Sequence, residues 1–301
     1  TENDLKKLAL RKPDLVFSGV KYFYFADGII WLNDYLELHD ILYIASNRTA
    51  LHNEHDKSIA KKIIQKANIR TADFFTTEPG EHQNEMSIPI AFPLFIKPLT
   101  GGDSRGVDTN SIVYDFLSFQ AKILDIKRKY NLRSLVETYL SGKEYSVSIL
   151  QDHSNENLEA MPIEIVVKRN INGHRILDYD IKENDHEKLI KVSDSKIFNQ
   201  LSDLSKNAFT ALDGKSLGRI DIKMDYRGVP YFIEANLMPG LRKGYFYRSC
   251  LLNLNMSYEQ MILTVADNGL SSRRIHSSIA NTGLSSRRIH SSIANTGLSS
   301  H

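Results

Sequence analysis

Residues 218–240 read GRIDIKMDYRGVPYFIEANLMPG, and this stretch constrains the fold more than any other part of the chain. Apolar and polar residues alternate on both sides of a YRG turn, which predicts two neighbouring strands of one sheet. Asp221 lies on the first strand, and Glu234 and Asn236 lie two apart on the second, so the last two side chains share a face. We expect three oxygen ligands to converge at this place.

Carboxylate and amide oxygens suit hard cations such as Mg²⁺, which keep their remaining positions for water and phosphate. The two strands therefore predict a metal-nucleotide site. The alternative is a sheet whose acids only face solvent.

Two other segments favour the nucleotide site over this alternative. Lys97 ends an apolar run and precedes PLTGGDSRG, whose glycines let backbone N–H groups close over phosphate oxygens. The loop is not a Walker A sequence, because no GK[ST] follows the glycines. Further on, LVETYLSGKE carries Glu137 and Glu144, acids that can accept from an adenine amino group or a ribose hydroxyl.

The rest of the chain alternates strand and helix patterns, which indicates an α/β fold. We expect helices at 56–69, 116–130, 195–213 and 257–267, with a further helix and strand within 33–46. Other strands are expected at 14–20, 93–97, 134–140, 143–150 and 161–167, and a long polar loop at 170–192.

Composition excludes several classes of protein. With 301 residues, 42% of them hydrophobic, the chain is long enough for a sizeable core and two or three lobes. Lys and Arg number 38 against 36 Asp and Glu, so the charge balance shows no nucleic-acid or membrane-surface footprint. The single cysteine, Cys250, excludes a disulfide framework, and the charged start TENDLKKLAL is unlike a signal peptide. A cytoplasmic protein is the expectation.

After Asp267 the sequence GLSSRRIHSSIANT occurs twice in tandem and begins a third time. The 14-residue unit has too few apolar residues to build a solenoid core. We expect this tail to carry no chemistry, and an amphipathic helix used for self-association is the alternative.

These motifs, in this order, resemble the ATP-grasp superfamily and more narrowly the D-alanine–D-alanine ligase family. The resemblance runs from Asp14 to Asp267, and its carriers are DLVF, the DK at 56–57, FIKPLTGGDSRGV, VETYLSGKEYSVSIL, GRIDIKMD and FIEANLMPG. It implies an α/β fold of the α+β ATP-grasp type, with three lobes and ATP between the central and C-terminal ones. The expected divisions are a partial, truncated N-terminal lobe at 1–56, a central lobe at 57–144, a C-terminal lobe with the metal site at 145–267, and the repeat tail at 268–301.

The resemblance also assigns roles to individual residues. It implies that Lys57 and Lys97 contact the ATP phosphates, that Lys182 covers the γ-phosphate from a mobile loop, and that Arg219 stabilises charge developing at the reacting centre. The other residues implied for nucleotide binding are Gly101, Gly102, Ser104, Glu137, the backbone of Tyr139 and Leu140, and Glu144. Two Mg²⁺ ions, with Mn²⁺ as an alternative, would be bound by Asp221, Glu234 and Asn236.

The positions implied for the amino-acid substrates depart from the family pattern. These are Lys21, Asp103, Gly240, Tyr245 and Phe246. Lys21 stands where the family has a histidine, Asp103 replaces a serine, and Tyr245 and Phe246 replace a serine and a leucine. Arg242, Lys243 and Arg248 are further cations that could bind a substrate carboxylate, and a solvated surface is the alternative for each.

The resemblance therefore implies an ATP-dependent carboxylate–amine ligase that joins an amino acid to another amino acid or a small carboxylic metabolite through an acyl phosphate. A specialised natural-product ligase of the mycosporine or peptide type is one alternative, and a catalytically inactive nucleotide-binding relative is another. The implied partners are small molecules, with neither nucleic acid nor membrane. Dimers are common in the family, so a homodimer remains open.

Overall fold

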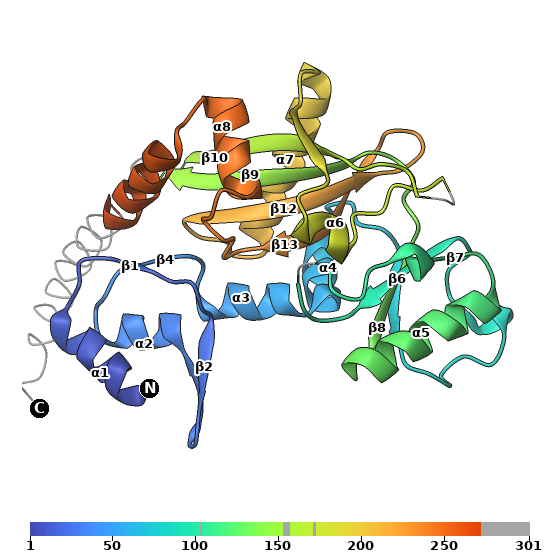
Figure 1. The fold of residues 1–301 in the computed structure, drawn as a ribbon, viewed down its shortest axis with the longest axis horizontal. Coiled ribbons are helices and arrows are strands. Elements are labelled where there is room, and N and C mark those ends of the chain that lie inside the picture. The colour runs from blue at the N-terminus through green and yellow to red at the C-terminus, as the bar shows by residue number, and fades with distance from the viewer. Residues whose placement is uncertain (103, 153–156, 171–172, 272–301) are drawn as a thin grey trace, which may run out of the picture.

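The computed structural model describes residues 1–102, 104–152, 157–170 and 173–271. Three parts are visible in Figure 1: an N-terminal part at the lower left, a large sheet above it, and a smaller sheet at the right. Sheets and helices are mixed throughout, as the alternating sequence pattern predicts.

The N-terminal part is small and contains short elements. It consists of α1 (Glu2–Arg11), the hairpin β2 (Tyr22–Phe25) and β3 (Gly28–Trp31), α2 (Leu32–Leu38), and the parallel pair β1 (Val16–Phe17) and β4 (Tyr43–Ile44). Its core consists of Leu5, Leu32, Leu36 and Ile41. The strand expected at 14–20 is only two residues long, because the chain turns into the hairpin after Phe17.

Two consecutive helices, α3 (Arg48–His55) and α4 (Lys57–Lys66), lead from this part to the sheets (Figure 1). Each begins at a side-chain cap. Asn47 accepts from the Ala50 N–H, and Asp56 accepts from the N–H groups of the first turn of α4. Because α4 packs against a strand of each sheet, its inward-facing side chains lie between the two sheets.

The smaller sheet has the strand order β5-β8-β6-β7 and is antiparallel. Its strands are β5 (Phe74–Thr77), β6 (Leu94–Pro98), β7 (Ile112–Val113) and β8 (Ser134–Thr138), accompanied by the 3-10 turns Glu85–Ser87 and Thr109–Ser111. Helix α5 (Phe116–Tyr130) covers it and begins with a capping box at Asp115. Phe119, Ile123 and Ile126 of this helix pack against Ile96 and Val136 of the sheet.

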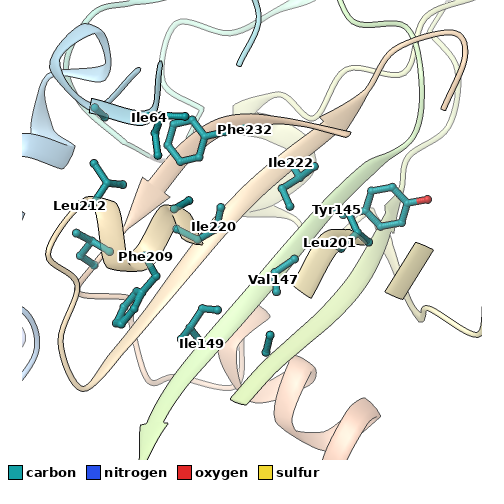
Figure 2. Close-up of a cluster of buried hydrophobic side chains, with 14 of the residues drawn as sticks. Ile64, Tyr145, Val147, Ile149, Leu201, Phe209, Leu212, Ile220, Ile222 and Phe232 are labelled. Atoms are coloured by element: carbon teal, nitrogen blue, oxygen red, sulfur yellow. The ribbon is translucent and has the colours of Figure 1, made fainter. Parts of the chain in front are cut away.

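The larger sheet has the order β11-β10-β9-β12-β13, with every neighbouring pair antiparallel. Its strands are β9 (Glu144–Asp152), β10 (Asn157–Val166), β11 (Lys188–Lys191), β12 (Leu217–Met224) and β13 (Pro230–Asn236). The largest core cluster lies between this sheet and α7 (Ser195–Ala211), as Figure 2 shows for Val147, Ile149, Leu201, Phe209 and Ile220.

The other face of the larger sheet carries two further helices over part of its width. Helix α8 (Tyr245–Leu254) packs on β9, β10 and β11, and a helix over 258–271 follows it. Leu150, Met161 and Leu217 of the sheet pack with Phe246 and Met261 of these helices. The uncovered remainder of this face holds the polar side chains discussed below.

The expectation of a long loop over 170–192 is wrong for part of that segment. It contains α6 (Tyr179–Glu183), which begins where Asp178 accepts from the Ile181 N–H, and β11, which pairs with β10 at the sheet edge. An N-cap starts the short helix, and an available sheet edge orders a polar strand that has no strong hydrophobic pattern. Among the described residues, no helix is both long and apolar enough to cross a membrane.

Candidate active site

The register of β12 and β13 brings the polar residues of the 218–240 stretch together. Asp221 lies opposite Glu234, and Arg219 lies opposite Asn236. Directly opposed residues of an antiparallel pair point to the same face, so all four side chains share the uncovered face of the larger sheet. Ser146 of β9 lies opposite Asp221 on the other side and extends this polar row.

Arg219 and Asp221 form a bidentate ion pair within one strand. The Arg219 Nε and Nη2 atoms donate to the two carboxylate oxygens of Asp221 at 3.0 and 2.9 Å. The Ser146 hydroxyl donates to the same carboxylate at 2.8 Å. Burial opposes the charged guanidinium, but the Asp221 carboxylate outweighs it and raises the pKa of Arg219. The guanidinium also lies 5.4 Å from the centre of the Tyr245 ring.

A buried array of alternating charges joins the two sheets. Lys61 Nζ lies 2.6 Å from Glu137 Oε1, and Lys97 Nζ lies 3.0 Å from Glu137 Oε2. Lys97 Nζ also lies 3.9 Å from Glu234 Oε2. Because each charge faces an opposite one, the array lowers the free-energy cost of burying ions. Glu137 thus sits between two lysines, with both carboxylate oxygens in ion pairs.

The pKa values in this array follow from burial and from the neighbouring charges. Burial disfavours the charged form of Lys97, but Glu137 and Glu234 raise its pKa above the ordinary value. Burial also disfavours ionised Glu234, yet Lys97 and Lys57 dominate and lower its pKa to about 2. For Lys57 and Lys61 burial prevails and lowers the pKa. The site therefore holds a charged Lys97 next to an ionised Glu234 at neutral pH.

One cavity between the two sheets collects most of the residues that the sequence assigned to nucleotide binding. Including space that is open to solvent, it contains about 850 Å³ of empty volume, within the size range of small-molecule sites. Its lining includes Lys57, Lys97, Gly101, Gly102, Ser104, Glu137, Tyr139, Leu140, Glu144, Lys182, Asp221 and Glu234. Ala72, Phe95, Ile176, Leu177 and Ile233 add apolar walls. The cavity thus combines a cationic and acidic end with apolar surface.

Several lining residues already have partners within the chain. Lys57 Nζ donates to the Gly101 carbonyl at 2.6 Å, and Lys223 Nζ donates to Glu144 at 2.8 Å. The backbone N–H of Tyr139 donates to the Pro93 carbonyl at 3.1 Å. Gly101 has a φ of +96°, a conformation that favours glycine, so this position constrains the loop.

The residues expected to bind the amino-acid substrates are scattered by comparison. Tyr245 reaches the site by lying over Arg219, and its hydroxyl donates to Glu187 at 2.6 Å. Phe246, the residue after Tyr245 on α8, faces the larger sheet. Its side chain is only 1% exposed and packs in the core. Lys21 pairs with Glu54 and is not among the residues that line the cavity. Gly240 lines a separate apolar hollow, and Asp103 lies outside the described residues.

Comparison with known proteins places the chain in a family. A family model described as the D-ala D-ala ligase C-terminus matches residues 63–267, which include both strands of the polar face. The chain belongs to the D-alanine–D-alanine ligase family. The ATP-grasp fold and the ATP-dependent, C–N bond-forming ligase class implied by the sequence are therefore confirmed.

Individual relatives agree with this assignment. The D-alanine–D-alanine ligase of Aquifex aeolicus is 29% identical over 239 residues, which cover 78% of this chain and 75% of that protein. A crystal structure of the Bacillus anthracis ligase complexed with ATP matches 92% of this chain and 85% of its own, with a TM-score of 0.69 and 23% identity. The VanG D-Ala:D-Ser ligase of Enterococcus faecalis matches 85% of this chain and 73% of its own, with a TM-score of 0.66 and 20% identity.

The oxygen donors of this ligase-family chain suit a hard divalent cation. Asp221, Glu234 and Asn236 supply two carboxylates and an amide from facing positions of β12 and β13. Within the described part of the chain, no group of three His, Cys, Asp or Glu side chains is arranged to hold a metal ion. The predicted ligands are two carboxylates and one amide, so they do not form such a group. Their oxygen atoms are ligands that Mg²⁺ prefers.

Two buried charged residues beside the site are missing from the sequence predictions. Lys61 is fully buried and pairs with Glu137, and Glu54 is buried on α3 and pairs with Lys21. A signal for Lys61 exists in the sequence: with Ala60 and Ile64 it lies on the apolar stripe of α4. A lysine within such a stripe indicates a buried partner of opposite charge.

Proposed function

We propose that this chain uses ATP to convert a substrate carboxylate into an acyl phosphate and then joins the acyl group to an amine. The observation that carries the proposal is the single cavity in which Lys57, Lys97 and Lys182 lie with Asp221 and Glu234 between the two sheets. Cations and acids gathered in this way suit a triphosphate and its metal ions.

Binding of ATP would use most of the residues that line this cavity. Lys57 and Lys97 would contact phosphate oxygens, and Gly101, Gly102 and Ser104 would supply the glycine-loop backbone. Lys57 would then exchange its bond to the Gly101 carbonyl for one to phosphate. The adenine would be held by Glu137 and the backbone of Tyr139 and Leu140, and the ribose by Glu144, which line the same cavity.

The metal ligands would be Asp221, Glu234 and Asn236, holding two Mg²⁺ ions, or Mn²⁺ in their place. Bound there, the ions would neutralise charge on the phosphates during transfer. Asp221 would share its carboxylate with Arg219, which already holds it by two hydrogen bonds. This contact would keep the guanidinium at the reacting end of the site.

The reaction would take place in two displacements. A carboxylate oxygen attacks the γ-phosphorus and ADP leaves; the amine then attacks the acyl carbon, phosphate leaves, and the amine nitrogen loses its extra proton. Lys182 would lie against the γ-phosphate during the first step. Arg219 would stabilise the negative charge that forms on the acyl oxygen and phosphate during the second. The chain would act mainly by positioning reactants and by neutralising charge.

The substrates we propose are amino acids, with D-alanine first because the relatives carry that name. Two contacts favour a substrate other than D-alanine in at least one of the two substrate positions. Tyr245, which lies over Arg219, has its hydroxyl committed to Glu187, and Lys21 has its ammonium committed to Glu54. A relative that is named a D-Ala:D-Ser ligase shows that the second amino acid varies among structural neighbours.

We further propose the domain boundaries 1–56, 57–144 and 145–267, a homodimer, and a cytoplasmic location. The boundaries are supported by the strands of the smaller sheet, which all lie within 57–144, and by β9, which begins at Glu144. The dimer is supported by family resemblance, and the location by the use of ATP.

The experiment that tests this function is ADP release with Mg-ATP across a panel of substrates. The panel contains D-alanine, other D- and L-amino acids, and small carboxylic metabolites paired with amino acids. Glu234→Gln should abolish turnover, whereas Glu164→Gln, a carboxylate of the same sheet paired with Lys143, should not. Turnover with D-alanine supports the first substrate, turnover with another pair reassigns it, and ATP binding without turnover for any pair contradicts the proposal.

A further inference from the structure

Glu54 is a buried acid that none of the roles above requires. Its side chain is 3% exposed and lies one residue before the end of α3. One carboxylate oxygen accepts from Lys21 Nζ, and the other accepts from the backbone N–H of Leu237. Leu237 directly follows Asn236, so Glu54 holds the chain immediately beyond a proposed metal ligand.

Glu54 belongs to a row of charged residues that reach different walls of the site. Glu54, Lys57 and Lys61 are spaced by three and four residues along α3 and α4. Glu54 contacts the end of β13, Lys57 contacts the glycine loop at the Gly101 carbonyl, and Lys61 contacts Glu137 of β8. The two helices therefore connect three segments that carry proposed site residues.

The Glu54 contact is one of several that hold the chain just beyond β13, where the Leu237 carbonyl also accepts from the Ser46 N–H at 3.4 Å. Asn236 Oδ1 accepts from the Met238 N–H at 3.2 Å, which bends the chain locally. Leu237 itself is fully buried, so its N–H depends on a protein acceptor. Without Glu54 that donor would lose its partner, and the segment would rearrange to satisfy it.

Burying this carboxylate is unfavourable by itself. Burial raises the pKa of Glu54, and Lys21, the Leu237 N–H and Arg219 offset the effect only in part. An apolar residue at this helix position would avoid that penalty. A buried acid that contacts the segment next to a ligand strand is better explained by positioning than by stability.

We propose that Glu54 is a positioning residue, which fixes the Asn236 end of β13 through the Leu237 N–H and thereby sets the affinity of the site for its divalent metal. The inference rests on the proposed metal role of Asn236. Outer groups that orient metal ligands commonly change metal affinity by about 10- to 100-fold when removed. Here the outer group acts through the backbone, so the lower end of that range applies.

The test measures Mn²⁺ binding by electron paramagnetic resonance in the presence of the ATP analogue AMP-PNP. Glu54→Ala removes the acceptor and should weaken Mn²⁺ binding about tenfold. Glu54→Gln keeps an oxygen that can accept from the Leu237 N–H, so it should retain most of the affinity. Glu37→Ala is the control, because Glu37 also accepts a hydrogen bond in the N-terminal part, from Tyr43, but far from β13 along the chain. Metal-free AMP-PNP binding should be unchanged in all three variants.

Two results would overturn the proposal. Unchanged Mn²⁺ affinity in Glu54→Ala would remove the positioning role, and equal loss of metal-free AMP-PNP binding would show a general structural defect instead. Asn236→Ala separates these outcomes from failure of the proposed function. If Asn236→Ala weakens Mn²⁺ binding and Glu54→Ala does not, only the positioning inference fails; if neither does, the metal assignment fails first.

Discussion

Replacing Lys61 with Met tests the buried charge array. Lys61 is 0% exposed, its Nζ lies 2.6 Å from Glu137, and it also donates to the Thr71 hydroxyl. Met keeps much of the apolar chain but no charge, so Glu137 retains Lys97 alone as its cation. Removing one partner of a buried ion pair destabilises a protein by about 3–5 kcal/mol. Because Glu137 keeps its contact with Lys97 at 3.0 Å, we expect the lower end of this range, about 3 kcal/mol. For a chain of this size the melting temperature should fall by roughly 6–12 °C.

The assay is thermal unfolding by circular dichroism of the wild type, Lys61→Met, Glu137→Gln and the double variant. Because the two residues interact, the double variant should be less destabilised than the sum of the single ones, by about 1–2 kcal/mol. Lys129→Met is the control, because Lys129 pairs with Asp125 on the exposed surface of α5. The melting temperature of this variant should equal that of the wild type. The reasoning is refuted if Lys61→Met has the melting temperature of the wild type. It is also refuted if the destabilisation of the double variant equals the sum of the two single variants.

Three other predictions concern separate parts of the chain. Arg219→Lys should lower kcat about 100-fold, because one ammonium cannot replace the bidentate guanidinium. Steady-state kinetics would measure this loss, and calorimetry should show an unchanged affinity for AMP-PNP. An equally large loss of AMP-PNP affinity would contradict the assigned role. Gly142→Ala should destabilise the fold by about 2 kcal/mol or more, because its Cβ would lie 2.4 Å from the Asp225 carbonyl; Gly19→Ala meets no atom within 4 Å and should melt like the wild type. Burial raises the pKa of Cys250 to about 12, so the folded thiol should resist Ellman's reagent between pH 7 and 10. The unfolded thiol ionises from about pH 9, so stability should fall above that pH relative to Cys250→Ala; rapid labelling of folded protein would refute this.

Much of the fold and of the site follows from short-range sequence patterns. The strands of the 218–240 stretch alternate with period two, which alone places Glu234 and Asn236 on one face. The helix at 116–130 appears with the same bounds, because an Asp cap and an apolar stripe define it locally. The order of the motifs then implies the family, and family membership supplies the lobe arrangement that pattern analysis alone does not.

The burial of Lys61 and Glu54 and the strand β11 were not predicted, because they depend on contacts between segments that are distant in sequence. Lys61 is buried because β8 presents Glu137 to it, and Glu54 is buried because the chain beyond β13 presents the Leu237 N–H. Neither partner is within reach along the sequence. The strand β11 likewise forms because β10 offers an open edge, although its sequence KLIK is short and half polar. Long-range pairing of this kind leaves only weak traces in one sequence.

Phe246 is a residue that was expected at the site but lies in the core. The resemblance to the ligase family implied a substrate role for Phe246, but α8 turns this side chain into the core and leaves Tyr245 over Arg219. Two adjacent helical residues point about 100° apart, so only one of them can face the site.

The central claim is that the carboxylate is activated as an acyl phosphate, and the most direct measurement follows a carboxylate oxygen. A substrate pair that supports ADP release would be supplied with its carboxylate labelled with ¹⁸O, and the inorganic phosphate would be analysed by mass spectrometry. The account predicts one labelled oxygen transferred to phosphate per turnover, with ADP unlabelled and transfer absent in Glu234→Gln. Unlabelled phosphate, or label recovered in AMP, would contradict it.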